Sequence, residues 1–398
     1  SAPRDVEAYA ASCSALLTHL WSLGYDNVRH LAIANEPGGS GDFQCTGDAK
    51  AYFVKTFRAL DRRLRTDGIR DRVRLWAPEG SEDITYLELC AEELADCVDV
   101  YSQHWYAPTP EEVGRTVEYL KTIGAMPLAV TECTERIGGA AAWGRSLAGY
   151  TICAANAGGS GIVMWAMHGV KSMSDYRSDS WAFAGGQLLW DPQLDGGAYH
   201  DLFYDFGLLC RYIPPHSRVI RAETRAHELR VAVWETPEGE LTVAAEGKPS
   251  DAKRSLRVTF ESLVGKTFYK HAYIPAHGMT EESGILPPVC AEIPCGTELY
   301  DPDFSTEYNV TVYTTLPPAA QVRITPPSAS MRAGESLSFT ADIIDGTPGA
   351  IWSVAAGAGT VTPEGVFTLP SDTVPGSVTA LRAQNADGAY NICLIRTR

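Results

Sequence analysis

Two hydrophobic periods alternate along the first 210 residues. Short, continuous apolar runs predict strands, and segments with apolar residues at every third or fourth position predict helices. The strands are expected at 28–34, 73–77, 98–104, 127–131 and 161–166, and the helices at 5–21, 49–64, 84–94, 110–124, 140–157 and 199–211. Apolar strands separated by helices are typical of a parallel sheet that helices cover.

This pattern leaves two α/β architectures open. One is an open five-stranded sheet. The other is a (β/α)₈ TIM barrel, which needs eight strand–helix units on about 250 residues and would have its first three units before residue 1. Periodicity alone does not choose between these two architectures.

The helical period ends near Val219, where short strands with alternating polar and apolar residues begin. Segments 229–234, 240–245, 255–260, 267–273 and 307–314 follow this pattern, which is typical of a β-sandwich. A proline-containing linker at 316–320 then precedes another all-β segment. We therefore expect three domains, with the α/β part, open sheet or partial barrel, at 1–213, a β-sandwich at 214–316 and a second all-β module at 319–398.

Composition and charge exclude several kinds of partner. The chain has 398 residues, of which 45% are hydrophobic and 21% charged, as in ordinary folded proteins. Its net charge of -16 argues against binding to nucleic acid or to an anionic membrane surface. No apolar run approaches the roughly 20 residues of a membrane-spanning helix, so we expect no membrane insertion.

Cysteine and histidine spacing predicts neither a metal site nor a cofactor. The ten cysteines include no C-x-x-C pair, and the nine histidines are scattered. Gly265-Lys266-Thr267 lacks the earlier glycine of a phosphate-binding loop. Cys290 and Cys295, flanked by proline and glycine, have the spacing of a small disulfide loop.

Polar and aromatic residues stand where the predicted strands end. In parallel α/β folds, catalytic groups lie at the carboxyl ends of strands. These ends carry Asn35-Glu36-Pro37, Pro78-Glu79-Gly80, Gln103-His104-Trp105-Tyr106, Thr131-Glu132 and Trp165-Ala166-Met167-His168. A lone glutamate there is more often a helix cap or a solvated loop residue. Two glutamates beside aromatic residues favour glycoside hydrolysis, in which one carboxyl protonates the leaving oxygen and the other attacks the anomeric carbon.

Taken in register, these motifs resemble those of the clan A glycoside hydrolases, in particular families 5, 30 and 39. Those enzymes are retaining (β/α)₈ barrels with Asn-Glu after strand 4 and Glu after strand 7, similar to Asn35-Glu36 and Glu132 here. His104-x-Tyr106 is similar to the motif after strand 6, and Trp165 to the tryptophan after strand 8. The 319–398 module resembles a bacterial Ig-like domain, which implies a secreted or cell-surface bacterial protein.

The resemblance implies a role for each matched residue. Glu36 would be the general acid/base and Glu132 the nucleophile, with their carboxyl groups about 5–5.5 Å apart. Tyr106 would donate a hydrogen bond to Glu132. The expected substrate-binding residues are Asn35, His104, Tyr106, Trp165, Glu79, Trp105 and His168. For Glu79, contact with substrate and a plain loop position stand equally open.

We therefore expect a retaining, cofactor-free glycosidase that acts on a neutral glycan. Because this chain would supply only strands 4–8 of the barrel, we also expect strands 1–3 on a separate, cleaved or omitted N-terminal segment. The alternative is a non-catalytic carbohydrate-binding or adhesin-like protein on the same scaffold. Only the enzyme would form a covalent glycosyl intermediate on Glu132.

Overall fold

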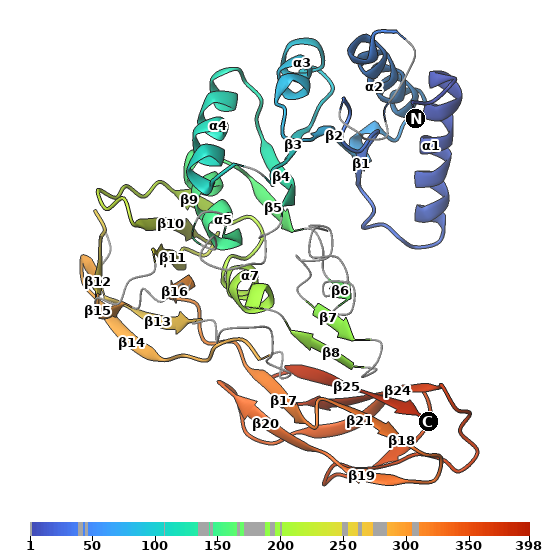
Figure 1. Ribbon diagram of the computed structural model, residues 1–398, viewed down its shortest axis with the longest axis vertical. Helices are drawn as coiled ribbons and strands as arrows, with labels where there is room; N and C mark the ends of the chain where they lie inside the picture. The colour runs from blue at the N-terminus through green and yellow to red at the C-terminus, as the bar shows by residue number, and fades with distance from the viewer. Residues whose placement is uncertain are drawn as a thin grey trace. The chain divides into compact units, whose positions relative to one another are not determined.

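The chain divides into two compact units, Ser1–Trp165 with Arg221–Glu223, and Ala166–Ile220 with Thr224–Arg398. The structure is a computed structural model (Figure 1). It describes residues 2–38, 43, 47–106, 108–133, 143, 146–164, 168–170, 188–191, 196–199, 201–248, 254–261, 265–273, 285–304 and 310–398, with the side chains of 168–202 outside this description. No helix in these ranges is long and apolar enough to cross a membrane.

A five-stranded parallel sheet forms the centre of the first unit. Its strands, each paired in parallel with the next, are β1 (His30–Ala32), β2 (Arg74–Gly80), β3 (Val100–His104), β4 (Leu128–Cys133) and β5 (Gly161–Met164). The helices are α1 (Val6–Ser22), α2 (Ala49–Thr66), the 3₁₀ turn η1 (Arg70–Arg72), α3 (Thr85–Glu93), α4 (Pro110–Thr122) and α5 (Leu147–Ala157). Figure 1 shows a curved sheet with helices along its outer side. The predicted parallel α/β sheet is therefore confirmed as a half-barrel, and an eight-stranded barrel stays a prediction.

Capping residues fix where several of these helices begin. Asp5 caps α1 by accepting a hydrogen bond from the Glu7 backbone at 2.9 Å. Thr109 and Glu112 form a reciprocal capping box at the start of α4. Ser146 caps α5, so this helix begins later than the predicted residue 140. These side chains satisfy N–H groups that have no partner within the helix.

A partly buried ion network ties α2 to the turn before β2. Arg70 Nε lies 2.7 Å from Asp61 Oδ1, and Arg70 Nη2 lies 2.9 Å from Asp99 Oδ2. The Arg70 and Asp61 side chains are only 11% and 12% exposed. At this burial the ion pairs of Asp61 and Asp99 with Arg70 stabilise the fold, because an unpaired charge away from water would destabilise it.

Replacing Arg70 is therefore expected to destabilise the first unit. Arg70→Met should lower the free energy of unfolding by about 3 kcal/mol, because it leaves two partly buried carboxylates without this partner. Arg62→Met is the matched control, since Arg62 pairs with Glu7 at side-chain exposures of 60% and 65% and should matter by less than about 1 kcal/mol. Hydrogen exchange of β2 and β3 amides in urea measures both effects. Equal losses in the two variants would contradict the prediction.

In the described part of the second unit, the secondary structure is all-β apart from α7 (Asp201–Tyr212). Its largest sheet has the order β14 (Ala291–Cys295), β13 (Lys266–Ala272), β16 (Val310–Thr314), β11 (Leu241–Gly247), β10 (Leu229–Glu235) and β9 (Arg218–Ile220). A separate antiparallel pair joins β12 (Arg254–Thr259) to β15 (Glu298–Phe304). Helix α7 packs on the large sheet, since the Tyr212 ring stacks on His271 with centroids 4.4 Å apart. The helix predicted to end the barrel part thus belongs to a compact unit with β-strands.

Residues 321–397 form further sheets around a core of their own. The first is a pair, β17 (Gln321–Thr325) with β20 (Thr340–Ile344). The second has the order β18 (Ser328–Met331), β25 (Tyr390–Thr397), β24 (Val378–Gln384) and β21 (Ile351–Ala356). The third has the order β19 (Ser336–Ser338), β23 (Val366–Thr368) and β22 (Thr360–Val361). Phe339, Phe367 and Leu381 are buried together in this core, and Trp352 packs against it. An all-β segment is present as predicted, while its Ig-like character stays a prediction.

Two local expectations are wrong. A small sheet, made of β6 (His168–Val170), β7 (Leu188–Asp191) and β8 (Gly196–Tyr199), stands where no strands were expected, while residues 165 and 166 of the predicted strand lie outside the described residues. Cys290 and Cys295 are both free thiols. Cys290 directly precedes the extended strand β14 and Cys295 ends it, and a rise of about 3.3 Å per residue keeps such positions too far apart for a disulfide.

Candidate active site

Three glutamates and one histidine meet at the carboxyl ends of the parallel strands. Glu36 follows β1, while Glu79, His104 and Glu132 lie at or near the ends of β2, β3 and β4. His104 Nδ1 is 3.0 Å from Glu36 Oε1 and 3.5 Å from Glu132 Oε2. His104 Nε2 is 3.0 Å from Glu79 Oε2. Strands that are consecutive in the sheet thus bring four of the predicted site residues into one cluster.

The backbone turns sharply where two of these glutamates stand. Glu36 and Glu79 have φ values of 48° and 57°, in the left-handed region that side-chain-bearing residues rarely adopt. Their backbones are linked, because the Glu36 N–H donates to the Glu79 carbonyl at 2.8 Å. Such backbone conformations are held by their surroundings and are common at functional sites.

His104 is the most deeply buried member of the cluster. Its side chain is 2% exposed, against 24% for Glu36, 15% for Glu79 and 20% for Glu132. Burial alone lowers the pKa of His104, but hydrogen bonds to Glu79 and Glu36 and the charge of Glu132 outweigh it and raise that pKa above its usual value. The neighbouring carboxylates therefore stabilise the charged form of the ring.

Tyr106 contacts the carboxylate of Glu132. Its hydroxyl donates a hydrogen bond to Glu132 Oε1, and its backbone N–H donates to Glu82 Oε1 at 2.8 Å. Burial, followed by the hydrogen bond to Glu132, raises the pKa of Tyr106 well above its usual value. The phenol therefore keeps its proton at ordinary pH and acts as a donor to Glu132.

The other predicted substrate-binding residues lie in varied surroundings. Asn35 is exposed beside Glu36. Trp105 is only 2% exposed, and its backbone N–H donates to the Glu132 carbonyl at 2.9 Å. Trp165 lies outside the described residues, and His168 opens β6 in the second unit with its side chain outside the description. The sugar-binding roles of these four residues stay predictions.

Sequence reasoning gave no role to two residues that support the cluster. Thr131 Oγ1 donates to Glu79 Oε2 at 2.7 Å. Ser102, which is fully buried, accepts a hydrogen bond at Oγ from the Glu79 backbone at 3.0 Å. A hydroxyl in a strand of a helix-covered sheet was the available signal for Ser102, because a buried hydroxyl needs a partner.

The cluster also has the spacing of a metal site. Glu36, His104 and Glu132 each offer one atom within 4.8 Å of the other two. However, both ring nitrogens of His104 are hydrogen-bonded to carboxylates. Metal binding there would have to displace a hydrogen bond of the ring, because a metal needs a neutral imidazole with a free lone pair. The same carboxyl and imidazole groups can also exchange protons.

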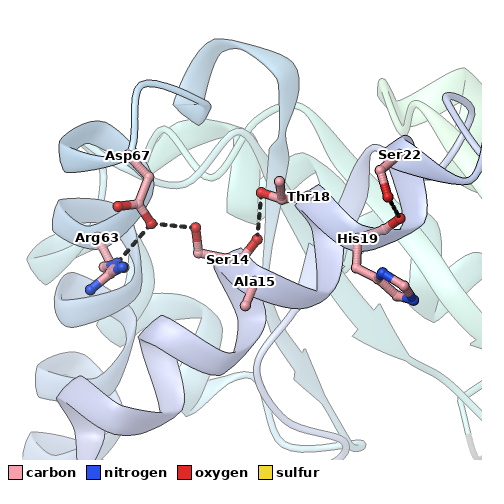
Figure 2. Close-up of a pocket in the computed structure, with 7 residues that line it drawn as sticks. All are labelled: Ser14, Ala15, Thr18, His19, Ser22, Arg63 and Asp67. Carbon is pink, nitrogen blue, oxygen red and sulfur yellow. Dashed lines mark hydrogen bonds and ion pairs between the residues drawn. The ribbon is translucent and has the colours of Figure 1, made fainter.

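A separate hollow of about 550 Å³ lies on the helices of the first unit (Figure 2). In it, Ser14 Oγ donates to Asp67 Oδ2 at 2.5 Å, and Arg63 Nε lies 2.7 Å from the same oxygen. These contacts tie α1 to the end of α2. The hollow is open and none of the strand-end glutamates lines it, so we interpret it as a surface groove between two packed helices.

The two predicted catalytic carboxylates have a chemically useful separation. An oxygen of Glu36 lies within 4.8 Å of an oxygen of Glu132. Retaining glycosidases hold their two carboxyl groups about 5–5.5 Å apart, whereas inverting enzymes hold them about 6.5–9.5 Å apart to admit a water molecule. With Tyr106 holding Glu132 and His104 between the two, the arrangement can place one carboxyl as proton donor and the other as nucleophile.

Solved structures that are similar in fold to this chain include several glycoside hydrolases. An α-L-arabinofuranosidase from Thermotoga maritima matches with a TM-score of 0.52 at 14% identity, over 72% of this chain and 66% of its own. The GH30 xylanase C catalytic domain from Talaromyces cellulolyticus matches with a TM-score of 0.53 at 11% identity, over 78% of this chain and 67% of its own. A monomeric β-xylosidase from Caulobacter crescentus matches with a TM-score of 0.50 at 12% identity, over 78% of this chain and 75% of its own.

These comparisons bear on the fold alone. Identities of 11–14% are too low to carry over an activity, and this chain spans 66% of the length of the arabinofuranosidase. Neither a protein-family model nor a curated protein sequence matches the chain. The chain therefore shares a half-barrel and β-sheet fold with these solved structures.

Proposed function

We propose that this chain carries the catalytic edge of a retaining glycoside hydrolase, with Glu36 as general acid/base and Glu132 as nucleophile. The observation that carries the proposal is the approach of their carboxylate oxygens to within 4.8 Å at the ends of β1 and β4. Fold similarity to an arabinofuranosidase, a xylanase and a xylosidase supports it. We also propose a neutral glycan as substrate and a location outside the cell.

The proposed reaction proceeds in two displacements. Glu132 attacks the anomeric carbon while Glu36 gives its proton to the leaving oxygen, which breaks the glycosidic bond and forms a glycosyl ester on Glu132. Water then attacks the same carbon as Glu36 takes the water proton, which releases Glu132 and restores Glu36. Each displacement inverts the anomeric centre, so the product keeps the configuration of the substrate.

A panel of aryl glycosides tests the proposal. We expect the full chain to hydrolyse at least one of the aryl α-L-arabinofuranosides, β-D-xylosides and β-D-glucosides, and proton NMR to show the product first as the retained anomer. Inversion would contradict the roles given to the two glutamates. Sugar binding without turnover across the panel would instead favour the carbohydrate-binding alternative.

Tyr106→Phe is expected to lower kcat by about 10- to 100-fold. The hydroxyl donates to the Glu132 carboxylate, and hydrogen bonds to charged groups contribute about 1.5–3 kcal/mol. Steady-state rates on the best substrate of the panel measure the effect. Tyr119→Phe is the matched control, because Tyr119 is 43% exposed and donates to Glu88 on a different part of the unit. Equal rates in the two variants would contradict the role of Tyr106.

A further inference from the structure

Glu79 is linked to four neighbours in the candidate site. Its Oε2 accepts hydrogen bonds from Thr131 Oγ1 at 2.7 Å and lies 3.0 Å from His104 Nε2. Its N–H donates to Ser102 Oγ at 3.0 Å, and its carbonyl accepts from the Glu36 N–H at 2.8 Å. The side chain is only 15% exposed. A residue held this tightly by the protein is poorly suited to bind a substrate.

Two irregularities in the sheet create the contact between Glu79 and Thr131. Between β2 and β3 the pairing passes from Pro78 with Ser102 to Gly80 with Gln103, so that Glu79 is the extra residue of a bulge. Between β3 and β4 it passes from Gln103 with Val130 to His104 with Glu132, so that Thr131 is the extra residue there. Bulges redirect side chains and are enriched next to active sites. Both bulged residues are hydrogen-bonded to each other.

We propose that Glu79 is a positioning residue that holds the Nε2–H of His104, so that only Nδ1, facing Glu36 and Glu132, changes its proton occupancy during catalysis. This inference rests on the proposed function. An ionised carboxylate can only accept, so Nε2 keeps its hydrogen while Glu79 is charged. In a Ser-His-Asp triad, a carboxylate orients the histidine through one ring nitrogen, while the other nitrogen exchanges a proton with the serine. Here Glu79 corresponds to that carboxylate, and Glu36 to the group on the proton-exchanging side.

The charge of Glu79 also affects the pH at which His104 loses its proton. The described groups that face His104 are Glu36, Glu79 and Glu132, and each favours the protonated ring. Removing one negative charge favours loss of the proton, so His104 should deprotonate at lower pH. His104 Nδ1 lies 3.0 Å from Glu36 Oε1, so loss of the His104 proton changes the surroundings of the proposed general acid. The alkaline limb of kcat/KM, where the general acid is lost, should therefore move toward acid.

The direct test is a ¹⁵N titration of the histidines in the full chain, with the His104 signals assigned by their loss in His104→Asn. We expect the wild type to show Nε2 protonated at every pH and Nδ1 titrating alone. In Glu79→Gln the His104 midpoint should fall by about one pH unit or more. Glu118→Gln removes an equal charge from an exposed position on α4 and should leave the midpoint unchanged.

Two results would overturn the inference. One is a neutral His104 in the wild type that, at alkaline pH, carries its remaining proton on Nδ1 instead of Nε2. This result needs no variant. The other is an unchanged His104 midpoint in a folded Glu79→Gln protein. If the midpoint falls in Glu79→Gln while no glycoside is hydrolysed by the wild type, the positioning role of Glu79 stands and the proposed glycosidase function fails. On an active enzyme, the alkaline limb of kcat/KM should move with the midpoint.

Discussion

Glu132→Gln is expected to abolish measurable turnover, with kcat lowered by about 10⁴-fold or more, as for other enzymes that lose a covalent nucleophile. Glutamine matches glutamate in size and can still accept a hydrogen bond from Tyr106, so the fold should persist. It lacks the negative charge and the nucleophilic oxygen that attack the anomeric carbon. Initial rates on the best aryl glycoside, with sugar binding measured separately, give the effect on chemistry alone.

The control for this prediction is Glu118→Gln, which removes the same charge from an exposed position and should keep full activity. A covalent trap gives independent evidence. A 2-deoxy-2-fluoro glycoside with a good leaving group should label the wild type, and peptide mass mapping should place the sugar on Glu132. Normal turnover by Glu132→Gln, or a label on Glu36 or Glu79, would refute the assignment of the nucleophile.

The strand-end residues were predictable from sequence because each ends an apolar run. Leu75 and Ala77 in β2, like Leu128 and Val130 in β4, are almost fully buried. The carboxyl ends of consecutive parallel strands lie on one edge, so polar residues at those ends meet there. The position of the cluster therefore follows from periodicity, and its assignment to sugar chemistry came from the resemblance.

The contacts within the cluster were not predictable in the same way. Glu79 and Thr131 meet because both sheet pairings slip by one residue, and a bulge inserts its extra residue with no change in the hydrophobic pattern. Trp105 is mostly buried, although aromatic residues at strand ends are expected to face a sugar. The sheet of β6, β7 and β8 was missed because each of its strands has only three or four residues, too few to establish a period.

Glu36→Ala is expected to show an effect that depends on the leaving group. For an alkyl or phenyl glycoside, which needs its oxygen protonated, kcat/KM should fall by about 10²- to 10⁴-fold. For a 2,4-dinitrophenyl glycoside, whose phenolate leaves without protonation, kcat/KM should stay near that of the wild type. Its kcat should still fall, because water then attacks the glycosyl ester without a general base.

Rates with the two leaving groups, measured with and without sodium azide, test this role. Azide is already an anion and needs no base, so it should raise kcat of Glu36→Ala on the dinitrophenyl glycoside and leave the wild type unaffected. The alternative is that Glu36 only positions His104, which lies 3.0 Å away, and transfers no proton itself. In that case both leaving groups should lose kcat/KM by the same factor and azide should restore nothing. The ratio between the two leaving groups therefore separates proton transfer by Glu36 from support of its neighbour.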